Sequence, residues 1–190
     1  MKGSISAFDF ADLAEKAFTD CSGKFSVKKV PVADGGDFTG EVLRRALTAR
    51  PKEITVADPL GKKVSAAYGI SGKTAIIEMA DASGIKLLKS NELNPLQTST
   101  FGTGQLIADA VKSGCTEILL GIGGSATIDG GSGMLEALGF SLCDKEGLPV
   151  KGNGGNLLNI ARIQKPESLP EVSIKIICDV DNPLTGKNGA

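Results

Sequence analysis

The chain has 190 residues, 41% of them hydrophobic and 23% charged, and a formal net charge of -1. A chain of this size can bury a core without covalent staples, and its near-neutral charge gives no reason to expect nucleic acid or a membrane as a partner. It contains no histidine, which excludes a Ser-His triad, and no tryptophan, which argues against a stacking platform for single strands. An enzyme of this composition must use carboxylates, lysines, hydroxyls and backbone amides.

The beginning of the chain predicts a helix, followed by a strand, a glycine loop and a second helix. Ser6-Ala7-Phe8-Asp9 reads as a capping box, and apolar residues recur at helical spacing over 7–21. Residues 25–32 alternate and are rich in β-branched side chains, which predicts a strand that ends at Asp34-Gly35-Gly36. Apolar spacing over 38–47 predicts the next helix. Strand, glycine loop and helix form the first half of a βαβ unit.

The middle and end of the chain predict further strands and helices. Residues 54–79 contain short strands, and the two-residue turn Ser71-Gly72 favours an antiparallel hairpin. The remaining pattern predicts a helix over 102–112, a buried parallel strand over 117–122, a short helix near 134–138, a loop over 145–171 and a last strand over 172–178.

These elements predict an α/β fold. We expect residues 1–57 and 97–190 to form a Rossmann-like lobe with a parallel sheet, and residues 58–96 to form a smaller mixed or antiparallel subdomain. The lobe is expected to be incomplete.

Three predicted strand ends carry glycine or asparagine beside carboxylates. They are Asp34-Gly35-Gly36-Asp37, the loop 121–131 with Asp129, and Asp179-Val180-Asp181-Asn182. Ligands of open parallel sheets bind outside the carboxyl ends of strands, so the three loops could face one cleft. Glycines let backbone amides approach phosphate oxygens, and carboxylates can hold Mg²⁺ or accept a proton. The structural alternative is that the glycines make turns and the aspartates cap helices.

Two further patterns are open to more than one interpretation. Residues 98–104 place hydroxyls and glycines before a helix, which suits either an anion site or a hydroxyl-rich helix start. Residues 121–126 match the dinucleotide pattern G-x-G-x-x-[GA], with Asp144 near the position of a ribose-binding acid. A dinucleotide site needs a helix that begins inside this pattern, but a further glycine loop over 127–133 follows it. This loop argues against a dinucleotide site.

Taken together, several motifs resemble those of the bacterial-type (type I) glycerate kinase family. They are Lys2-Gly3-Ser4-Ile5-Ser6-Ala7, Pro31-Val32-Ala33-Asp34-Gly35-Gly36, Asn94-Pro95-Leu96 with 98–104, residues 121–127 with Asp129-Gly130-Gly131, and residues 178–184. They occur in order along nearly the whole chain. The resemblance implies ATP-dependent phosphorylation of D-glycerate with Mg²⁺, on a two-domain α/β fold. It also implies a cytoplasmic enzyme of glyoxylate-, glucarate- or serine-linked metabolism.

The resemblance also suggests roles for the motif residues. Asp34 is the candidate for orienting or deprotonating the glycerate hydroxyl, and Lys2 for neutralising phosphate or carboxylate charge. Asp179 and Asp181 are the candidates for holding Mg²⁺. The expected substrate- and phosphate-binding residues are Gly35, Gly36, Ser99, Thr100, Gly102, Thr103, Gly123, Gly124, Ser125, Asp129, Gly130 and Gly131.

The chain departs from the family pattern in three places. Family members open with a strand and an A-P-D-S-F segment before the K-G-S block, and they continue beyond the last motif. After A-D-G-G they carry E-G-T, where this chain has Asp37-Phe38-Thr39. We therefore expect a chain truncated at both ends, whose unpaired strand edges favour a homo-oligomer. The alternatives are a non-catalytic binding or interaction module of the same fold, or an NAD-binding protein.

Overall fold

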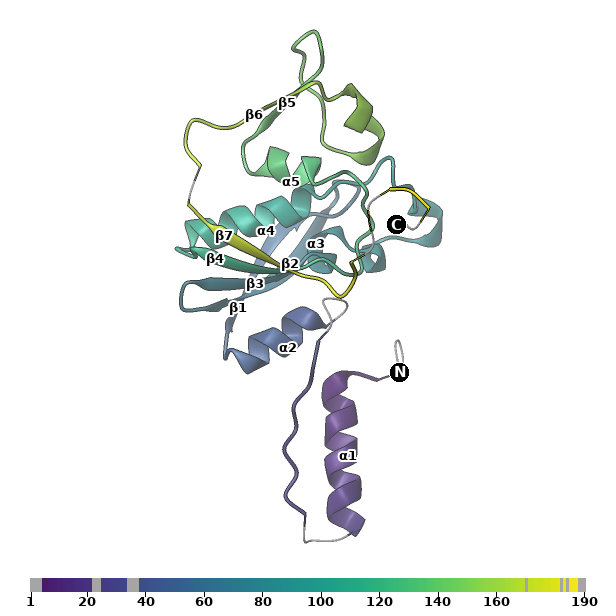
Figure 1. Cartoon of the computed structure of the whole chain (residues 1–190), viewed down its shortest axis with the longest axis vertical. Helices are drawn as coiled ribbons and strands as arrows, with labels where there is room; N and C mark the ends of the chain where they lie inside the picture. The colour runs from purple at the N-terminus through teal and green to yellow at the C-terminus, as the bar shows by residue number, and fades with distance from the viewer. Residues whose placement is uncertain are drawn as a thin grey trace.

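A mixed five-stranded sheet forms the centre of the computed structural model, which describes residues 5–21, 25–33, 38–169, 171–181, 183 and 185–187 (Figure 1). The strand order is β1-β2-β3-β4-β7. The bounds are β1 Arg50–Ala57, β2 Lys63–Ser71, β3 Thr74–Glu78, β4 Glu117–Gly121 and β7 Ser173–Ile177. The first three strands pair antiparallel, whereas β3, β4 and β7 are parallel. The predicted α/β class is confirmed.

The predicted hairpin joins β2 to β3. Gly72 has φ 59°, in the left-handed region that glycine adopts without strain. The strands expected in a separate subdomain at 58–96 extend the main sheet instead, because β3 pairs in parallel with β4. The sheet is therefore mixed, where the sequence predicted a parallel one. Local patterning predicts the hairpin but cannot show which distant strand lies beside it.

Helices cover both faces of the sheet. The helices α4 (Phe101–Lys112) and α5 (Ser132–Ala137) pack together, and α4 contacts β1, β2 and β3. The helix α2 (Thr39–Ala46) contacts β2 and β3 and lies on the other side of the sheet in Figure 1. Along β3, Ala75 and Ile77 belong to the core cluster that includes residues of α4, while Ile76 between them is equally buried. This alternation is that of a strand buried on both faces.

Short elements follow β3 and α5. The helix α3 (Ala80–Ser83) and the 3-10 helices η1 (Ile85–Leu87) and η2 (Ser90–Glu92) connect β3 towards α4. A second sheet pairs β5 (Ser141–Cys143) with β6 (Arg162–Gln164), and the 3-10 helix η3 (Gly154–Asn159) lies between them. The predicted loop over 145–171 thus contains β6 and η3. Strands of three residues are too short to show periodicity.

The predicted first helix is confirmed, but the strand expected after it is wrong. In α1 (Ala7–Cys21), the Ser6 Oγ accepts the Asp9 N–H at 3.1 Å and donates to the Asp9 Oδ2 at 2.7 Å. Residues 25–33 form no strand, because no described strand pairs with them. Both segments extend away from the sheet in Figure 1. Among the helices of the described ranges, none is long and apolar enough to cross a membrane.

Candidate functional site

The carboxyl ends of β3, β4 and β7 meet at one edge of the sheet. Glu78 is paired in register with Gly121, and Gly121 with Ile177. The loops that follow β4 and β7 therefore begin side by side, as the sequence predicts. Ligands of open α/β sheets bind at this edge. The third predicted loop, with Asp34, Gly35 and Gly36, lies outside the described residues, as does Lys2.

The loop after β4 presents a run of backbone amides. The N–H groups of Gly123, Gly124 and Ser125 donate to no group in the described part of the chain. Gly124 has φ 70°, so its backbone is left-handed. The Ile85 N–H holds the loop from the side by donating to the Gly124 carbonyl at 2.9 Å. Consecutive free amides at a strand end are suited to binding an anion such as phosphate.

A cavity of about 260 Å³ adjoins this loop. It is lined by Ile85, Leu93, Asn94, Pro95 and residues 125–128. Two motifs that lie far apart in the sequence, Asn94-Pro95 and the loop after β4, therefore meet in one cavity. Its size suits a small polar molecule or one part of a larger ligand.

The hydroxyls of 98–103 are directed into the protein. Ser99 Oγ donates to the Gly152 carbonyl at 2.5 Å, and Thr103 Oγ1 lies 2.7 Å from Ser83 Oγ. Ser99 and Thr103 are buried, and so is Gly102 at the start of α4. In the described structure these hydroxyls are engaged with protein groups. The Thr100 side chain makes no capping hydrogen bond to α4, so the role of this motif stays a prediction.

Asp129 links the starts of α4 and α5. Its side chain is buried and accepts the N–H and the hydroxyl of Thr100, and the N–H groups of Gly131 and Gly133. Gly130 and Gly131 both have positive φ, at 59° and 76°. The loop 123–131 therefore has two parts: free amides at its beginning and a buried hydrogen-bonded aspartate near its end.

Glu78, at the end of β3, is a buried carboxylate that the sequence reasoning missed. Its Oε2 accepts the Gly40 N–H at 3.1 Å, and its Oε1 lies 3.8 Å from Lys86 Nζ. Burial and the neighbouring Asp81 raise the pKa of Glu78, and the N–H groups of Gly40 and Phe38 oppose that rise. An acidic residue that ends an apolar strand was the available signal.

Asp179 and Asp181 follow β7 and are exposed. No group of three His, Cys, Asp or Glu side chains within the described residues is placed to hold a metal ion. Mg²⁺ is commonly bound through only one or two protein carboxylates together with substrate phosphates. Two carboxylates next to a loop of free amides are compatible with that kind of site.

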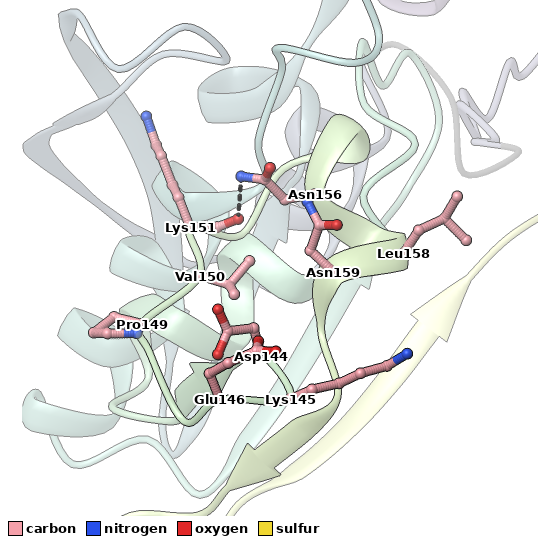
Figure 2. A pocket seen from close by; sticks show the side chains of 9 residues that line it. All are labelled: Asp144, Lys145, Glu146, Pro149, Val150, Lys151, Asn156, Leu158 and Asn159. Atoms are coloured by element: carbon pink, nitrogen blue, oxygen red, sulfur yellow. Dashed lines mark hydrogen bonds between the residues drawn. The ribbon is translucent and has the colours of Figure 1, made fainter.

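A larger cavity, of about 460 Å³, lies within residues 144–159 (Figure 2). Asp144, which lines it, accepts the Leu148 N–H at 2.8 Å, and the Asn156 amide donates to the Lys151 carbonyl at 3.0 Å. Asp144 thus stabilises a turn. The helix α5 begins only at Ser132, beyond the G-x-G-x-x-[GA] pattern. A dinucleotide fingerprint needs the helix to begin inside the motif, so the structure does not support this alternative.

A loop of free backbone amides and two exposed acidic side chains lie at the carboxyl edge of the sheet, which defines an α/β protein with a candidate ligand site at that edge. Comparison with known proteins gives the family. The Glycerate kinase family profile matches residues 1–190. The chain belongs to the glycerate kinase family.

Individual relatives agree with the family assignment. The chain is 45% identical to the glycerate kinase of Halalkalibacterium halodurans and to the glycerate 2-kinase of Escherichia coli. Each alignment covers 100% of this chain and 51% of the relative. A crystal structure of a Salmonella typhimurium LT2 protein described as glycerate kinase 2 superposes with a TM-score of 0.85 and 41% identity, over 99% of this chain and 52% of that one. The chain thus spans about half the length of the relatives it matches.

Proposed function

We propose that this chain carries the phosphate site of a glycerate kinase and transfers the γ-phosphate of ATP to a hydroxyl of D-glycerate, giving phosphoglycerate and ADP. The observation that carries the proposal is the run of free amides at Gly123, Gly124 and Ser125, at the end of a central parallel strand. Family membership over the whole chain supports the same reaction.

Phosphoryl transfer depends mainly on positioning and on neutralising charge. In our proposal the three free amides bind phosphate oxygens, and Asp179 or Asp181 helps hold Mg²⁺, which would neutralise phosphate charge. Asp34 orients or deprotonates the acceptor hydroxyl, and Lys2 adds positive charge. The adjoining cavity, with Asn94 on its wall, is of a size for the small acid.

The test is coupled-enzyme detection of ADP on adding D-glycerate to the protein with ATP and Mg²⁺. We expect ADP release that depends on both substrates. D-Lactate, which has the same configuration at C2 but lacks the second hydroxyl, is the control acid. ADP release that is the same with and without D-glycerate would contradict the proposed reaction.

Nucleotide binding is measured separately from turnover. A ligand present at about 100 times its Kd stabilises a protein by roughly 2.7 kcal/mol, so ATP-Mg²⁺ should raise the melting temperature. Stabilisation without turnover would favour the non-catalytic binding module, because this chain spans about half of its relatives. A shift with NAD and none with ATP-Mg²⁺ would favour the dinucleotide alternative.

A further inference from the structure

We propose that Glu78 is a positioning residue of this site, whose ionised carboxylate holds the first turn of α2 and Lys86 at the carboxyl edge where ligand binds. The inference rests on the proposed function, because it assigns Glu78 to the same phosphate site. Three observations carry it: a close approach at Gly40, a left-handed residue at Phe38, and a cluster of charges around the carboxylate.

The contact between β3 and α2 is made by Glu78 and Gly40. The Gly40 N–H donates to Glu78 Oε2 at 3.1 Å, across 38 positions of sequence. A Cβ added at Gly40 would lie 3.1 Å from that oxygen and 3.2 Å from the Glu78 Cβ. Such distances are tighter than most real Cβ contacts, so the glutamate and the glycine fit as a pair. The carboxylate therefore locates the first turn of α2 against the end of β3.

The residue before α2 is held in an unusual conformation. Phe38 has φ 67° and ψ 4°, the left-handed region that costs a non-glycine residue about 1–2 kcal/mol. Strained residues persist where their surroundings hold them, and they cluster at functional sites. The Phe38 N–H, like that of Gly40, is directed at Glu78 and lowers its pKa. Phe38 also follows the family's A-D-G-G motif in the sequence by two residues.

The charges around Glu78 come from three other elements. The Lys86 Nζ lies 3.8 Å from Glu78 Oε1 and 2.7 Å from Asp81 Oδ1. Lys86 directly follows Ile85, whose N–H donates to the Gly124 carbonyl. Asp81 in α3 also lies 4.0 Å from Arg44 of α2. The two acids thus fix a lysine beside the loop of free amides.

The ionised form of Glu78 does not serve stability. Burial, and then Asp81, raise the pKa of Glu78 in the folded chain. A carboxyl whose pKa rises on folding contributes stability below its unfolded pKa, and that contribution is lost as pH rises through the folded value. Above that folded value the charge therefore opposes folding. A buried charge that opposes folding at the edge of a ligand site indicates a functional role.

The experiment compares wild type with Glu78→Gln by calorimetry, using ATP-Mg²⁺ as the probe, and by thermal unfolding. Glutamine keeps an oxygen that can accept the Gly40 N–H but removes the charge. Simple electrostatics predicts tighter binding of an anion after a negative charge is removed. Our proposal predicts the opposite, a Kd about tenfold higher, because the stronger charged hydrogen bonds are lost. It also predicts a melting temperature at neutral pH no lower than that of wild type.

Acid should reproduce the effect of the substitution. The wild-type Kd should rise as pH falls through the Glu78 pKa, while the Kd of Glu78→Gln stays flat over that interval. Glu117→Gln is the matched control, because Glu117 is a carboxylate at the opposite end of β4. Its Kd should equal that of wild type.

Each other outcome is informative. Unchanged or tighter binding by Glu78→Gln overturns the positioning role. Weaker binding that comes with a lower melting temperature also overturns it, because a merely structural residue would have that effect. Wild type that binds ATP-Mg²⁺ but releases no ADP contradicts the proposed reaction alone, and the Kd comparison still decides the role of Glu78. Wild type that does not bind ATP-Mg²⁺ overturns both.

Discussion

Thr100 donates both its backbone N–H and its hydroxyl to the same oxygen of Asp129, Oδ2, at 2.7 and 2.8 Å. The hydroxyl also accepts the Met134 N–H at 2.9 Å. One threonine and one aspartate thus join the beginning of α4 to the beginning of α5. Because the loop with the free amides leads directly to Asp129, this contact also fixes the far end of that loop.

The first prediction concerns this contact. Asp129→Ala should lower the free energy of unfolding by about 3 kcal/mol or more, because it leaves several buried donors without an acceptor and each such group costs about 1–3 kcal/mol. Urea unfolding followed by circular dichroism measures the change. Thr100→Ser, which keeps both donors, is the control and should lose much less stability than Thr100→Val. Equal losses in the two threonine variants would show that the hydroxyl contributes little.

The glycines of α4 show how far the sequence could predict the site. The motif 98–104 predicts either an anion site or a helix start, since glycine permits close approach in both cases. In the structure a Cβ at Gly102 would lie 1.9 Å from the Ala57 carbonyl oxygen, and one at Gly104 would lie 2.5 Å from the Met134 carbonyl oxygen. The groups that approach these glycines are distant in sequence, so local patterning could not identify them.

Other parts of the fold and site were predicted because their signal is local. The apolar run 117–121 forms the buried strand β4, and the loops after β4 and β7 meet at one edge. The strand expected at 25–32 has the right alternation, but a strand needs a partner that alternation cannot supply. Glu78 was missed because its contact with Gly40 spans 38 positions.

The second prediction concerns Phe38. Phe38→Gly should have a free energy of unfolding about 1 kcal/mol higher than that of Phe38→Ala, because glycine adopts φ 67° without the strain that a side chain causes. Both substitutions remove the ring, which is 56% exposed, so both give up the contacts of the ring. Chemical unfolding of wild type and the two variants measures the difference. Equal free energies of unfolding in the alanine and glycine variants would contradict the explanation.

The third prediction concerns acid stability. Burial raises the pKa of Asp109, but hydrogen bonds from Lys52 and Tyr68 outweigh it and lower the pKa below its usual value. The Lys52 Nζ and the Tyr68 hydroxyl lie 2.7 and 2.6 Å from Asp109 Oδ2. A carboxyl with a lowered folded pKa contributes stability above its unfolded pKa, and that contribution is lost as pH falls through the folded value.

Wild type should therefore lose stability below about pH 4, the usual value for aspartate, more steeply than Asp109→Asn does. Urea unfolding between about pH 2 and 7 measures both slopes. Parallel curves for wild type and Asp109→Asn would contradict the assignment.

The fourth prediction concerns Mg²⁺. If Asp181 helps hold the metal, Asp181→Asn should weaken the Mg²⁺ dependence of ATP binding and leave the melting temperature of the free protein unchanged, because the side chain is exposed. Titrating Mg²⁺ at fixed ATP against wild type, Asp179→Asn and Asp181→Asn measures the effect. A variant that loses stability and keeps its metal dependence would assign the aspartate to the structure of the chain after β7.

The last prediction concerns self-association through the edge of the sheet. Within the described sheet β7 pairs only with β4, so its other edge is open. Ile174 and Ile176 on this strand are 41% and 61% exposed, and an open apolar edge is a template for pairing with another chain. We expect a second copy to add there, so the weight-average mass from sedimentation velocity should rise with concentration. Ile176→Lys should reduce that rise, because lysine at an edge opposes strand addition. Leu158→Lys is the matched control, since Leu158 is 99% exposed on η3 and carries the same change in charge. A monomer at every concentration, or the same response in both variants, would show that the β7 edge is not the surface of association.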